Sequence, residues 1–594
     1  MNRRLRSLCA LLMVPTVLSG CTSLPGDSAP QAIRSFERTH PNGDELAPVP
    51  GQEPDLLLRG FFTAAGNPAQ KHQAARVFLT ESMATNWDDT AATLILDRID
   101  LNAEPGATNQ SISYKVRGTV VGTLGAGGVY TPENGEYEAT MELERVNGEW
   151  RISSLPPGVV LERTELRNKF SPYELFFFAP TGKFLVRDRR WVYNGQASLD
   201  TALLSLLMEG PQHDLAPGVV NEIPPEAVFT GMEGGVYRFT GFGDLDIDQR
   251  HRFAAQVVWT LAHAGTRGPY RVELDGTPVD PVHEALTVED VAEFNPNAFA
   301  GAISPLYALN EGSLFLVDGA TSRPVAGPLG EAGTIASAEI SSSGGVVAVV
   351  ETRKSTGEPG ADGDTDSVPA PVAGLGRSRL LLGPVGGQTT EVLTAGTLTQ
   401  PSFEYEATAL WTVLDGRTIA RVARSTSTGE LSQVEVAAGV LDEPDNGGPD
   451  QLISVLRLSP DGVRVAMIRN GRVWVGTVAR PAPGERKIVR PVEIAPAIGD
   501  TALALSWQPD GSLLVGTSSP DTPVWRVEVD GSAVTSLPTG NLTAPVVAVA
   551  ASSNTLYVTD AHAMLQLPSS TPSAAFWREV PALQGTRAVP VVAD

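Results

Sequence analysis

The second half of the chain contains short strand pairs that recur at a regular spacing and turn at related sequences. Two of the turns, Ser459-Pro460-Asp461-Gly462 and Gln508-Pro509-Asp510-Gly511, begin 49 residues apart, a spacing typical of one four-stranded β-propeller blade. About six such units fit into residues 300–594, and a closed ring of blades leaves few exposed strand edges. The sequence therefore predicts a C-terminal all-β propeller of about six blades, with the Gly/Pro/Asp-rich residues 355–377 as a loop between strands.

An α+β domain is predicted over residues 54–165. Apolar residues at helical spacing around Phe61, and again in 74–79, predict two helices at its start. Alternating segments then predict an antiparallel sheet, and Asn147-Gly148 between two of them is a strong hairpin signal. This order of elements is similar to that of the NTF2-like fold.

A second, α/β domain is predicted over residues 172–280. Its first helix is predicted to begin at a cap formed by Asp200. The second helix follows Asp246, which with Gln249 three residues later resembles a capping box. Short strands flank both helices, so the fold class of the whole chain is predicted to be multidomain and rich in β-structure.

The first residues read as a bacterial export signal that ends in a cysteine. Three arginines precede the apolar run 8–18, which is too short to span a bilayer. The lipobox Leu18, Ser19, Gly20 and Cys21 then predicts cleavage before Cys21 and attachment of acyl groups such as palmitate to its thiol. The predicted location is the outer face of the cell membrane, held by a lipid anchor. The alternative is an ordinary secretory signal with an incidental cysteine.

These assignments divide the N-terminal region into a signal peptide, residues 1–20, and a flexible tether, residues 21–53. The tether is polar and rich in Pro, Gly, Asp and Ser, without a sustained apolar period. Cys9, the only other cysteine, lies in the predicted signal peptide. The chain from Cys21 onward can therefore form no internal disulfide, and its stability must come from packed cores.

Charge excludes one class of partner. The formal net charge is −24 and includes the three signal arginines, so the chain from Cys21 onward is more acidic still. Binding to nucleic acid needs clustered Lys and Arg that neutralise phosphates. We therefore expect no nucleic-acid partner.

The sequence shows no common catalytic or metal-binding signature. His251 and His263 share a predicted helix but lie twelve positions apart, too far to ligate one metal ion. Two Asp triplets mimic the first half of a calcium loop, but neither has the final acidic ligand. These triplets are Asp362, Asp364 and Asp366, and Asp244, Asp246 and Asp248. We predict no catalytic residue, no cofactor and no metal site, so the chain is not expected to be an enzyme.

Several segments taken together resemble one protein family. They are the lipobox, residues 176–180 with 189–192, the run 203–211 that ends in Leu-Met-Glu-Gly-Pro, the Ile223-Pro224 step, and Ala-Gln-Val-Val-Trp-Thr-Leu at 255–261. All of them look like the LpqB family of actinobacterial lipoproteins, and the likeness covers nearly all of the chain after the signal. The resemblance implies a GerMN (sporulation and germination) domain at about 172–280 and an LpqB-type propeller in the C-terminal half.

The resemblance also implies a function and a partner. It implies an accessory lipoprotein of the MtrA and MtrB two-component system, which contacts the extracytoplasmic sensor region of the membrane kinase MtrB and affects cell-envelope homeostasis and division. The residues themselves support an exported, tethered, multidomain protein with a propeller suited to partner binding. Two alternatives stay open: a peptidoglycan or glycan binder acting through the GerMN domain, and a cell-wall hydrolase.

Overall fold

The computed structural model describes residues 47–243, 245–297, 305–352, 378–425, 428–569 and 576–593. The predicted signal peptide, the tether up to residue 46 and the predicted loop 355–377 lie outside these residues. Of the helices that are described, none has the length and apolar character needed to cross a membrane.

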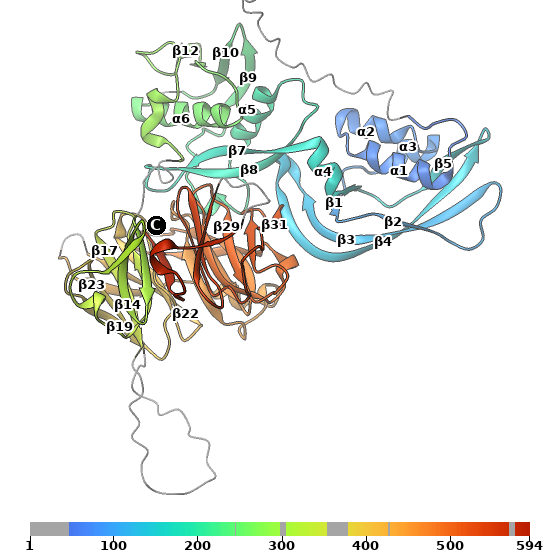
Figure 1. Cartoon of the computed structure of the whole chain (residues 1–594). Helices are drawn as coiled ribbons and strands as arrows, with labels where there is room; N and C mark the ends of the chain where they lie inside the picture. Colours follow the sequence, from blue (N-terminus) through green and yellow to red (C-terminus); the bar gives the residue numbers. More distant parts are fainter. Residues whose placement is uncertain are drawn as a thin grey trace, which may run out of the picture. The chain divides into compact units, whose positions relative to one another are not determined.

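The N-terminal domain has three helices that pack on one face of a curved sheet (Figure 1). The helices are α1 (Pro54–Ala65), α2 (Ala69–Arg76) and α3 (Glu81–Asn86), and α4 (Arg163–Lys169) follows the sheet. The strands are β1 (Thr93–Leu96), β2 (Asp100–Ala103), β3 (Ser111–Leu124), β4 (Tyr130–Val146), β5 (Glu149–Ser154) and β6 (Val159–Glu162), in the order β5-β4-β3-β1-β6 with β2 on β3. The predicted order of helices before a sheet is confirmed, and the sheet is antiparallel as predicted except at its edge, where β6 pairs parallel with β1. Asn147 and Gly148 both have positive φ in the hairpin between β4 and β5.

The prediction of a helix over residues 74–79 is wrong for the second half of that range. Helix α2 ends at Arg76, and Val77 and Phe78 form a turn. Leu79 pairs with Ile152 of the sheet, and both side chains are buried. A third helix starts after Thr80, whose side-chain oxygen accepts a hydrogen bond from the backbone of Met83. Phe78 and Leu79 are therefore buried from a turn and a single bridge to the sheet. Over so short a stretch, the spacing of these apolar residues resembles that of a helix.

The second domain begins with a long hairpin and then alternates helices and strands. Its elements are β7 (Phe170–Phe178), β8 (Leu185–Tyr193), α5 (Leu199–Glu209), β9 (Val228–Glu233), β10 (Val236–Thr240), α6 (Ile247–His263), β11 (Arg271–Leu274) and β12 (Thr277–Pro278). The last four strands form a sheet in the order β12-β11-β10-β9. Helix α6 lies against β7, where the Gln256 side chain donates to the carbonyl oxygen of Phe176 at 2.9 Å.

Two helix starts were predicted in this domain, and one is confirmed. Asp246 and Gln249 form the predicted capping box at the start of α6. The cap of helix α5 lies two residues earlier than predicted, because the Ser198 hydroxyl and not Asp200 caps it. The Asp200 carboxylate accepts hydrogen bonds from the Tyr237 hydroxyl at 2.6 Å and from the Thr266 hydroxyl at 2.8 Å. It therefore joins α5 to the sheet instead of capping the helix.

The C-terminal region is a six-bladed propeller, as predicted from the turn spacing (Figure 1). Its first three blades are β13 (Leu306–Asn310), β14 (Ser313–Asp318) and β15 (Thr321–Pro324) with β36 (Val589–Val592); β16 (Ile335–Ile340), β17 (Val346–Thr352), β18 (Ser378–Pro384) and β19 (Thr390–Ala395); β20 (Ser402–Phe403), β21 (Ala409–Leu414), β22 (Thr418–Arg424) and β23 (Leu431–Glu435). The last three are β24 (Ile453–Leu458), β25 (Arg464–Arg469), β26 (Arg472–Ala479) and β27 (Lys487–Glu493); β28 (Ala502–Trp507), β29 (Leu513–Thr517), β30 (Val524–Val527) and β31 (Val534–Ser536); β32 (Ala548–Ala551), β33 (Thr555–Thr559), β34 (Met564–Pro568) and β35 (Arg578–Glu579).

The ring is closed by its last strand. Strand β36 pairs antiparallel with β13, so the first blade combines one strand from the end of the chain with three from the start of the propeller. The two predicted turns lie at equivalent places in neighbouring blades, between β24 and β25 and between β28 and β29. In each turn an aspartate, Asp461 or Asp510, accepts a hydrogen bond from the backbone two residues further on.

Candidate functional site

Strand β8 carries charged side chains on both of its faces. Because side chains alternate along a strand, Asp188 and Arg190 share one face, while Arg187, Arg189 and Trp191 share the other. Asp188 and Arg190 are buried at 0% and 3% exposure. The first face meets the N-terminal domain. The second meets the propeller, and its Trp191 also packs into the core of the N-terminal domain.

The Asp188–Arg190 pair joins the first two domains. Arg190 donates from Nε and Nη2 to the two carboxylate oxygens of Asp188, at 2.9 and 2.8 Å. Its other guanidinium contacts are the carbonyl oxygens of Gly127 in the N-terminal domain and Gly210 after α5, each at 3.1 Å. The backbone of Gln212 donates to Asp188 at 2.8 Å. The buried charges are thus paired and hydrogen-bonded, which is the condition for burying them at tolerable cost.

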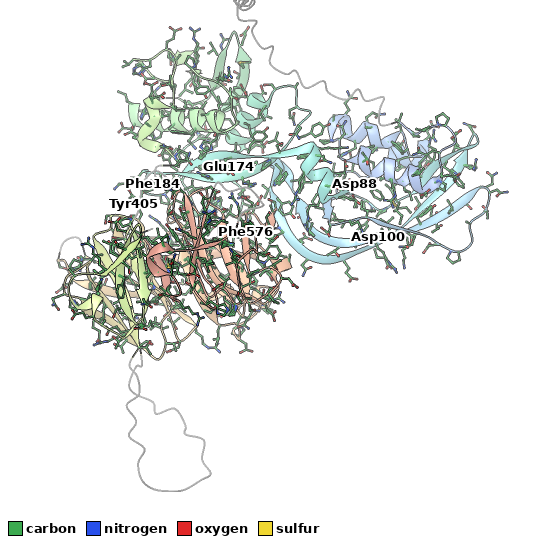
Figure 2. All side chains as sticks on the ribbon, in the orientation of Figure 1. Asp88, Asp100, Glu174, Phe184, Tyr405 and Phe576 are labelled. Atoms are coloured by element: carbon green, nitrogen blue, oxygen red, sulfur yellow. The ribbon has the colours of Figure 1, made fainter. Side chains whose placement is uncertain are left out.

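Arg189 joins the second domain to the propeller. Its guanidinium lies 3.2 Å from carboxylate oxygens of both Glu174 and Glu528, and 3.4 Å from Asp530. The Trp191 indole N–H also donates to Asp530, at 3.3 Å. Burial raises the pKa of Glu174 above its ordinary value, although Arg189 and Arg187 act in the opposite direction. Figure 2 labels Glu174 on the β7–β8 hairpin.

Further contacts extend this interface over the face of the propeller that carries the two repeated turns. Arg187 donates to the carbonyl oxygen of Asp510 at 2.6 Å, and Arg464 donates to the carbonyl oxygen of Arg187 at 2.7 Å. The rings of Phe184 and Tyr405, both labelled in Figure 2, have centroids 4.3 Å apart. All the described residues accordingly belong to one compact unit.

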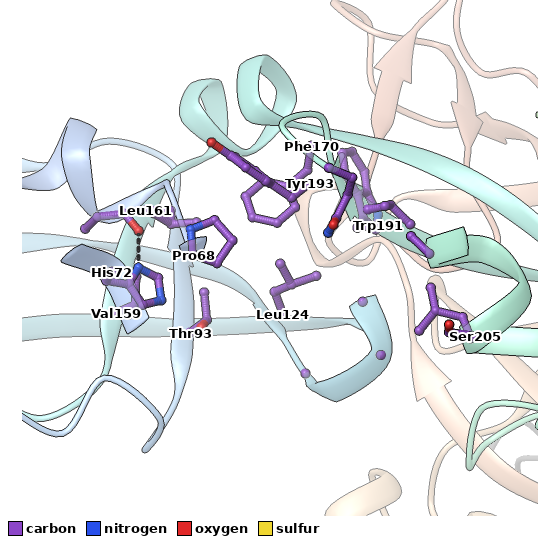
Figure 3. Close-up of a pocket in the computed structure, with 18 residues that line it drawn as sticks. Pro68, His72, Thr93, Leu124, Val159, Leu161, Phe170, Trp191, Tyr193 and Ser205 are labelled. Carbon is purple, nitrogen blue, oxygen red and sulfur yellow. Dashed lines mark hydrogen bonds between the residues drawn. The ribbon is translucent and has the colours of Figure 1, made fainter. Parts of the chain in front are cut away.

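An open pocket of about 420 Å³ lies where the N-terminal domain meets β8 and α5 (Figure 3). Its lining is mostly apolar and aromatic, which is typical of ligand pockets. From the N-terminal domain the lining residues are Ala65, Pro68, His72, Thr93, Leu124, Gly125, Gly127, Gly128, Val159 and Leu161. From the second domain they are Phe170, Trp191, Val192, Tyr193, Gln196, Ala202, Ser205 and Leu206.

Polar groups in this pocket are few and neutral. His72 Nδ1 lies 2.8 Å from the carbonyl oxygen of Ala65 and must donate to it, because that oxygen can only accept. Burial lowers the pKa of His72, so its imidazole is uncharged near pH 7. Gly128 has a φ of +74° and packs against β8, where a Cβ atom would lie 2.2 Å from the carbonyl oxygen of Trp191. A glycine is therefore required where the two domains meet at the pocket.

The two histidines considered for metal binding have separate surroundings. His251 lies 2.8 Å from a carboxylate oxygen of Glu293, whereas His263 packs edge-on against Phe176, with 4.9 Å between ring centroids. Asp246 caps α6, and Asp244 and the triplet at 362–366 lie outside the described residues. Across the described parts of the chain, no three His, Cys, Asp or Glu side chains are grouped so that they could hold a metal ion.

His263 predicts a loss of stability in acid. Partial burial, and then the charge of Arg187, lower its pKa from 6.5 to about 4. Between these pH values the unfolded chain binds a proton at this site and the folded chain does not, so the free energy of unfolding falls as the pH is lowered from about 6.5 to about 4. We expect His263→Gln to flatten this part of the curve of melting temperature against pH. Parallel curves for the two proteins contradict the prediction.

The predicted lipobox, Leu18 to Cys21, lies outside the described residues and stays a prediction. Neither the pocket nor the interface of β8 was predicted from the sequence. One signal was present: the stretch Val186 to Trp191 has strand-like ends but three arginines and an aspartate inside it. A charged cluster within a strand that is buried on both faces indicates ion pairs with other domains.

Comparisons with known proteins agree with this architecture. Family models match residues 47–167 (lipoprotein LpqB, N-terminal domain), 174–280 (sporulation and spore germination) and 312–593 (lipoprotein LpqB beta-propeller domain). A Corynebacterium diphtheriae protein named Lipoprotein LpqB is 42% identical over 100% of this chain and 99% of its own length. The chain belongs to the LpqB lipoprotein family.

Other relatives cover the same length. LpqB lipoproteins of Corynebacterium jeikeium and Mycobacterium bovis are 41% and 32% identical over 97% and 99% of the chain, and over 96% and 99% of their own lengths. These names identify an envelope lipoprotein with a β-propeller and a germination-type domain, and they indicate no catalytic family. The resemblance inferred from the sequence segments is thereby confirmed.

Proposed function

We propose that this LpqB-family chain is anchored to the outer face of the cell membrane through Cys21 and binds the extracytoplasmic region of a two-component sensor histidine kinase. Through this contact it modulates kinase signalling in cell-envelope homeostasis and division. The observation that carries the proposal is the open pocket of about 420 Å³ with aromatic walls. Such a pocket accepts an apolar anchor residue of a protein partner, the kind of contact that dominates binding energy at interfaces.

The rest of the structure suits a docking platform. The partly buried ion pair of Arg189 with Glu528 connects β8 to the propeller, and the hydrogen bond from Arg190 to Gly127 connects it to the N-terminal domain. The pocket is therefore held in place before a partner arrives, and less ordering is needed on binding. A lipid anchor would confine the chain and the kinase to one plane and raise their effective concentration, so that a weak contact can regulate.

Peptidoglycan is a second candidate ligand, favoured by the same walls. The rings of Phe170, Trp191 and Tyr193 line the pocket and offer flat apolar faces to sugar rings. A hydrolase has less support, because no Asp or Glu is among the described residues that line this pocket, and glycoside hydrolysis ordinarily uses a pair of carboxylates.

The test is to block the pocket with a charged side chain. Ser205 is exposed on α5 and lines the pocket, so Ser205→Arg places a long cation at its mouth. We expect the soluble chain 22–594 to bind the purified kinase region with a micromolar Kd, and Ser205→Arg to weaken that Kd at least about tenfold.

The matched control is Ser82→Arg, the same change at an exposed position of α3 outside the pocket. It should leave the Kd unchanged, and both variants should keep the melting temperature of the parent, since exposed substitutions change stability little. Equal Kd values for all three proteins contradict a role of the pocket. Absence of kinase binding together with binding of peptidoglycan fragments that Ser205→Arg abolishes favours the glycan alternative.

A further inference from the structure

Three arginines lie close together between the third and fourth blades of the propeller, and none of them lines the pocket described above. Arg421 lies on β22, Arg480 directly follows β26, and Arg486 directly precedes β27. Arg480 lies beside the turn at Gly462, where a Cβ atom would be 3.4 Å from its Nη2. We call these three residues with Glu404 the arginine cluster.

Glu404 is the carboxylate of the arginine cluster, and both of its oxygens already accept hydrogen bonds. Glu404 accepts hydrogen bonds from Arg421 Nε at 2.7 Å and Nη2 at 3.0 Å, from the Trp411 indole at 2.9 Å and from Arg486 Nη2 at 3.3 Å. Burial by itself raises the pKa of Glu404, but the hydrogen bonds and charges of the arginines outweigh it, so the pKa lies below its ordinary value. Glu404 is therefore ionised and compensates one of the three cations.

Arg480 has no such compensation. It makes no hydrogen bond and no ion pair with any described residue, and its Nε atom is buried without a partner, as is Nε of Arg486. Burial and the charge of Arg486 lower the pKa of Arg480, and the charges of Glu404 and Asp461 offset this lowering only in part. The nearby Asp461 is occupied in its own turn, where one of its oxygens accepts from the Ser459 hydroxyl and the Val463 backbone.

Other buried arginines of this protein have acceptors for most of their donors, although Nε of Arg469 lacks one. Arg457 donates to Glu339 at 2.7 Å, and Arg190 forms its two-bonded pair with Asp188. Arg469 donates to three backbone carbonyl oxygens. Arg480 departs from this pattern because none of its donors has an acceptor among the described residues, although the chain has a net charge of −24. Unpaired buried donors beside an excess of positive charge are costly unless an anion joins them.

We propose that the arginine cluster is a binding site for a phosphate group, held by the free donors of Arg480 and Arg486. A tetrahedral phosphate presents acceptor oxygens in several directions, so it can accept from guanidinium groups on different strands. Arginine suits this task because its planar fork matches phosphate oxygens in pairs. The phosphate can come from a lipid headgroup at the membrane surface or from phosphate free in solution. This inference does not depend on the proposed kinase contact, which involves other domains.

The test uses the soluble chain 22–594 and inorganic phosphate, titrated by calorimetry at constant ionic strength. We expect saturable binding by the parent chain and at least about tenfold weaker binding by Arg480→Gln, since a charge-assisted hydrogen bond is lost. The matched control is Arg472→Gln at the other end of β26, an exposed arginine paired with Glu493. It removes the same charge and should leave the affinity unchanged.

A stability measurement separates binding from folding. Without phosphate, Arg480→Gln should melt at the same temperature as the parent or higher, because the change removes a repelled cation that has no acceptor. Added phosphate should raise the melting temperature of the parent and of Arg472→Gln more than that of Arg480→Gln. Absence of phosphate binding by the parent, or equal affinity of Arg480→Gln and the parent, overturns the proposal.

Vesicles identify the source of the phosphate. If a headgroup is the ligand, the soluble chain should float with phosphatidylglycerol vesicles, inorganic phosphate should displace it, and Arg480→Gln should not float. If free phosphate is the ligand, calorimetry should show binding while flotation is absent or is unchanged in Arg480→Gln. Both results support the site, and they assign it to different sources.

Discussion

Asp188→Ala is expected to destabilise the protein by about 3–5 kcal/mol, the cost of leaving a buried arginine without its counter-charge. Asp188 is fully buried, and the guanidinium of Arg190, 4% exposed, has no other carboxylate within ion-pair distance among the described residues. The loss also loosens the contact with Gly127, so the N-terminal domain should unfold or detach at lower denaturant concentration. Urea unfolding followed by tryptophan fluorescence measures the effect.

Asp100→Ala is the matched control for this change. Asp100, labelled in Figure 2, pairs with Arg98 at the surface, and the two side chains are 51% and 74% exposed. Exposed pairs contribute about 0–1 kcal/mol, so the midpoint should barely move. Similar losses for Asp188→Ala and Asp100→Ala contradict the structural role assigned to the buried pair.

Cys21→Ala is expected to abolish membrane attachment. Each buried CH₂ of an acyl chain contributes about 0.8 kcal/mol and one chain alone binds marginally, so the anchor depends on the two or three chains of a processed lipoprotein. The variant should remain an uncleaved precursor without label from a clickable fatty acid, and kinase output should change as in a deletion strain because the gain in effective concentration is lost. Metabolic labelling and fractionation provide the measurement.

Cys9→Ala gives the comparison, since Cys9 is the other cysteine of the chain and lies within the apolar run of the signal. It should be labelled, cleaved and anchored like the parent. Continued labelling of Cys21→Ala, or loss of labelling in Cys9→Ala, contradicts the assignment of the anchor.

Local patterns predicted much of the fold because the elements repeat or carry their own signals. The blades were visible in the turns at Asp461 and Asp510, whose carboxylates fold the backbone beside them. The capping box at Asp246 was equally local. The cap of α5 was misplaced because Ser198 and Asp200 are both good capping residues. The choice between them was decided by Tyr237 and Thr266, residues remote in sequence.

The candidate site could not be predicted in the same way. The pocket arises where segments near 65–72, 124–128 and 191–206 meet, and the contact of Trp191 with Asp530 joins residues 339 positions apart. Such pairings depend on how completed domains pack, which no hydrophobic period encodes. The closure of the ring by β36 has the same origin, since that short strand is identified as part of the first blade only by its pairing with β13.

Photo-crosslinking in living cells can show whether the pocket contacts the sensor kinase. A photoreactive amino acid at position 205 of the lipidated protein reports what lies at the mouth of the pocket, and one at position 82 serves as the control. We expect a covalent adduct with the extracytoplasmic region of the sensor kinase from position 205 and none from position 82. Adducts with peptidoglycan alone, or kinase adducts of equal yield from both positions, would contradict this expectation.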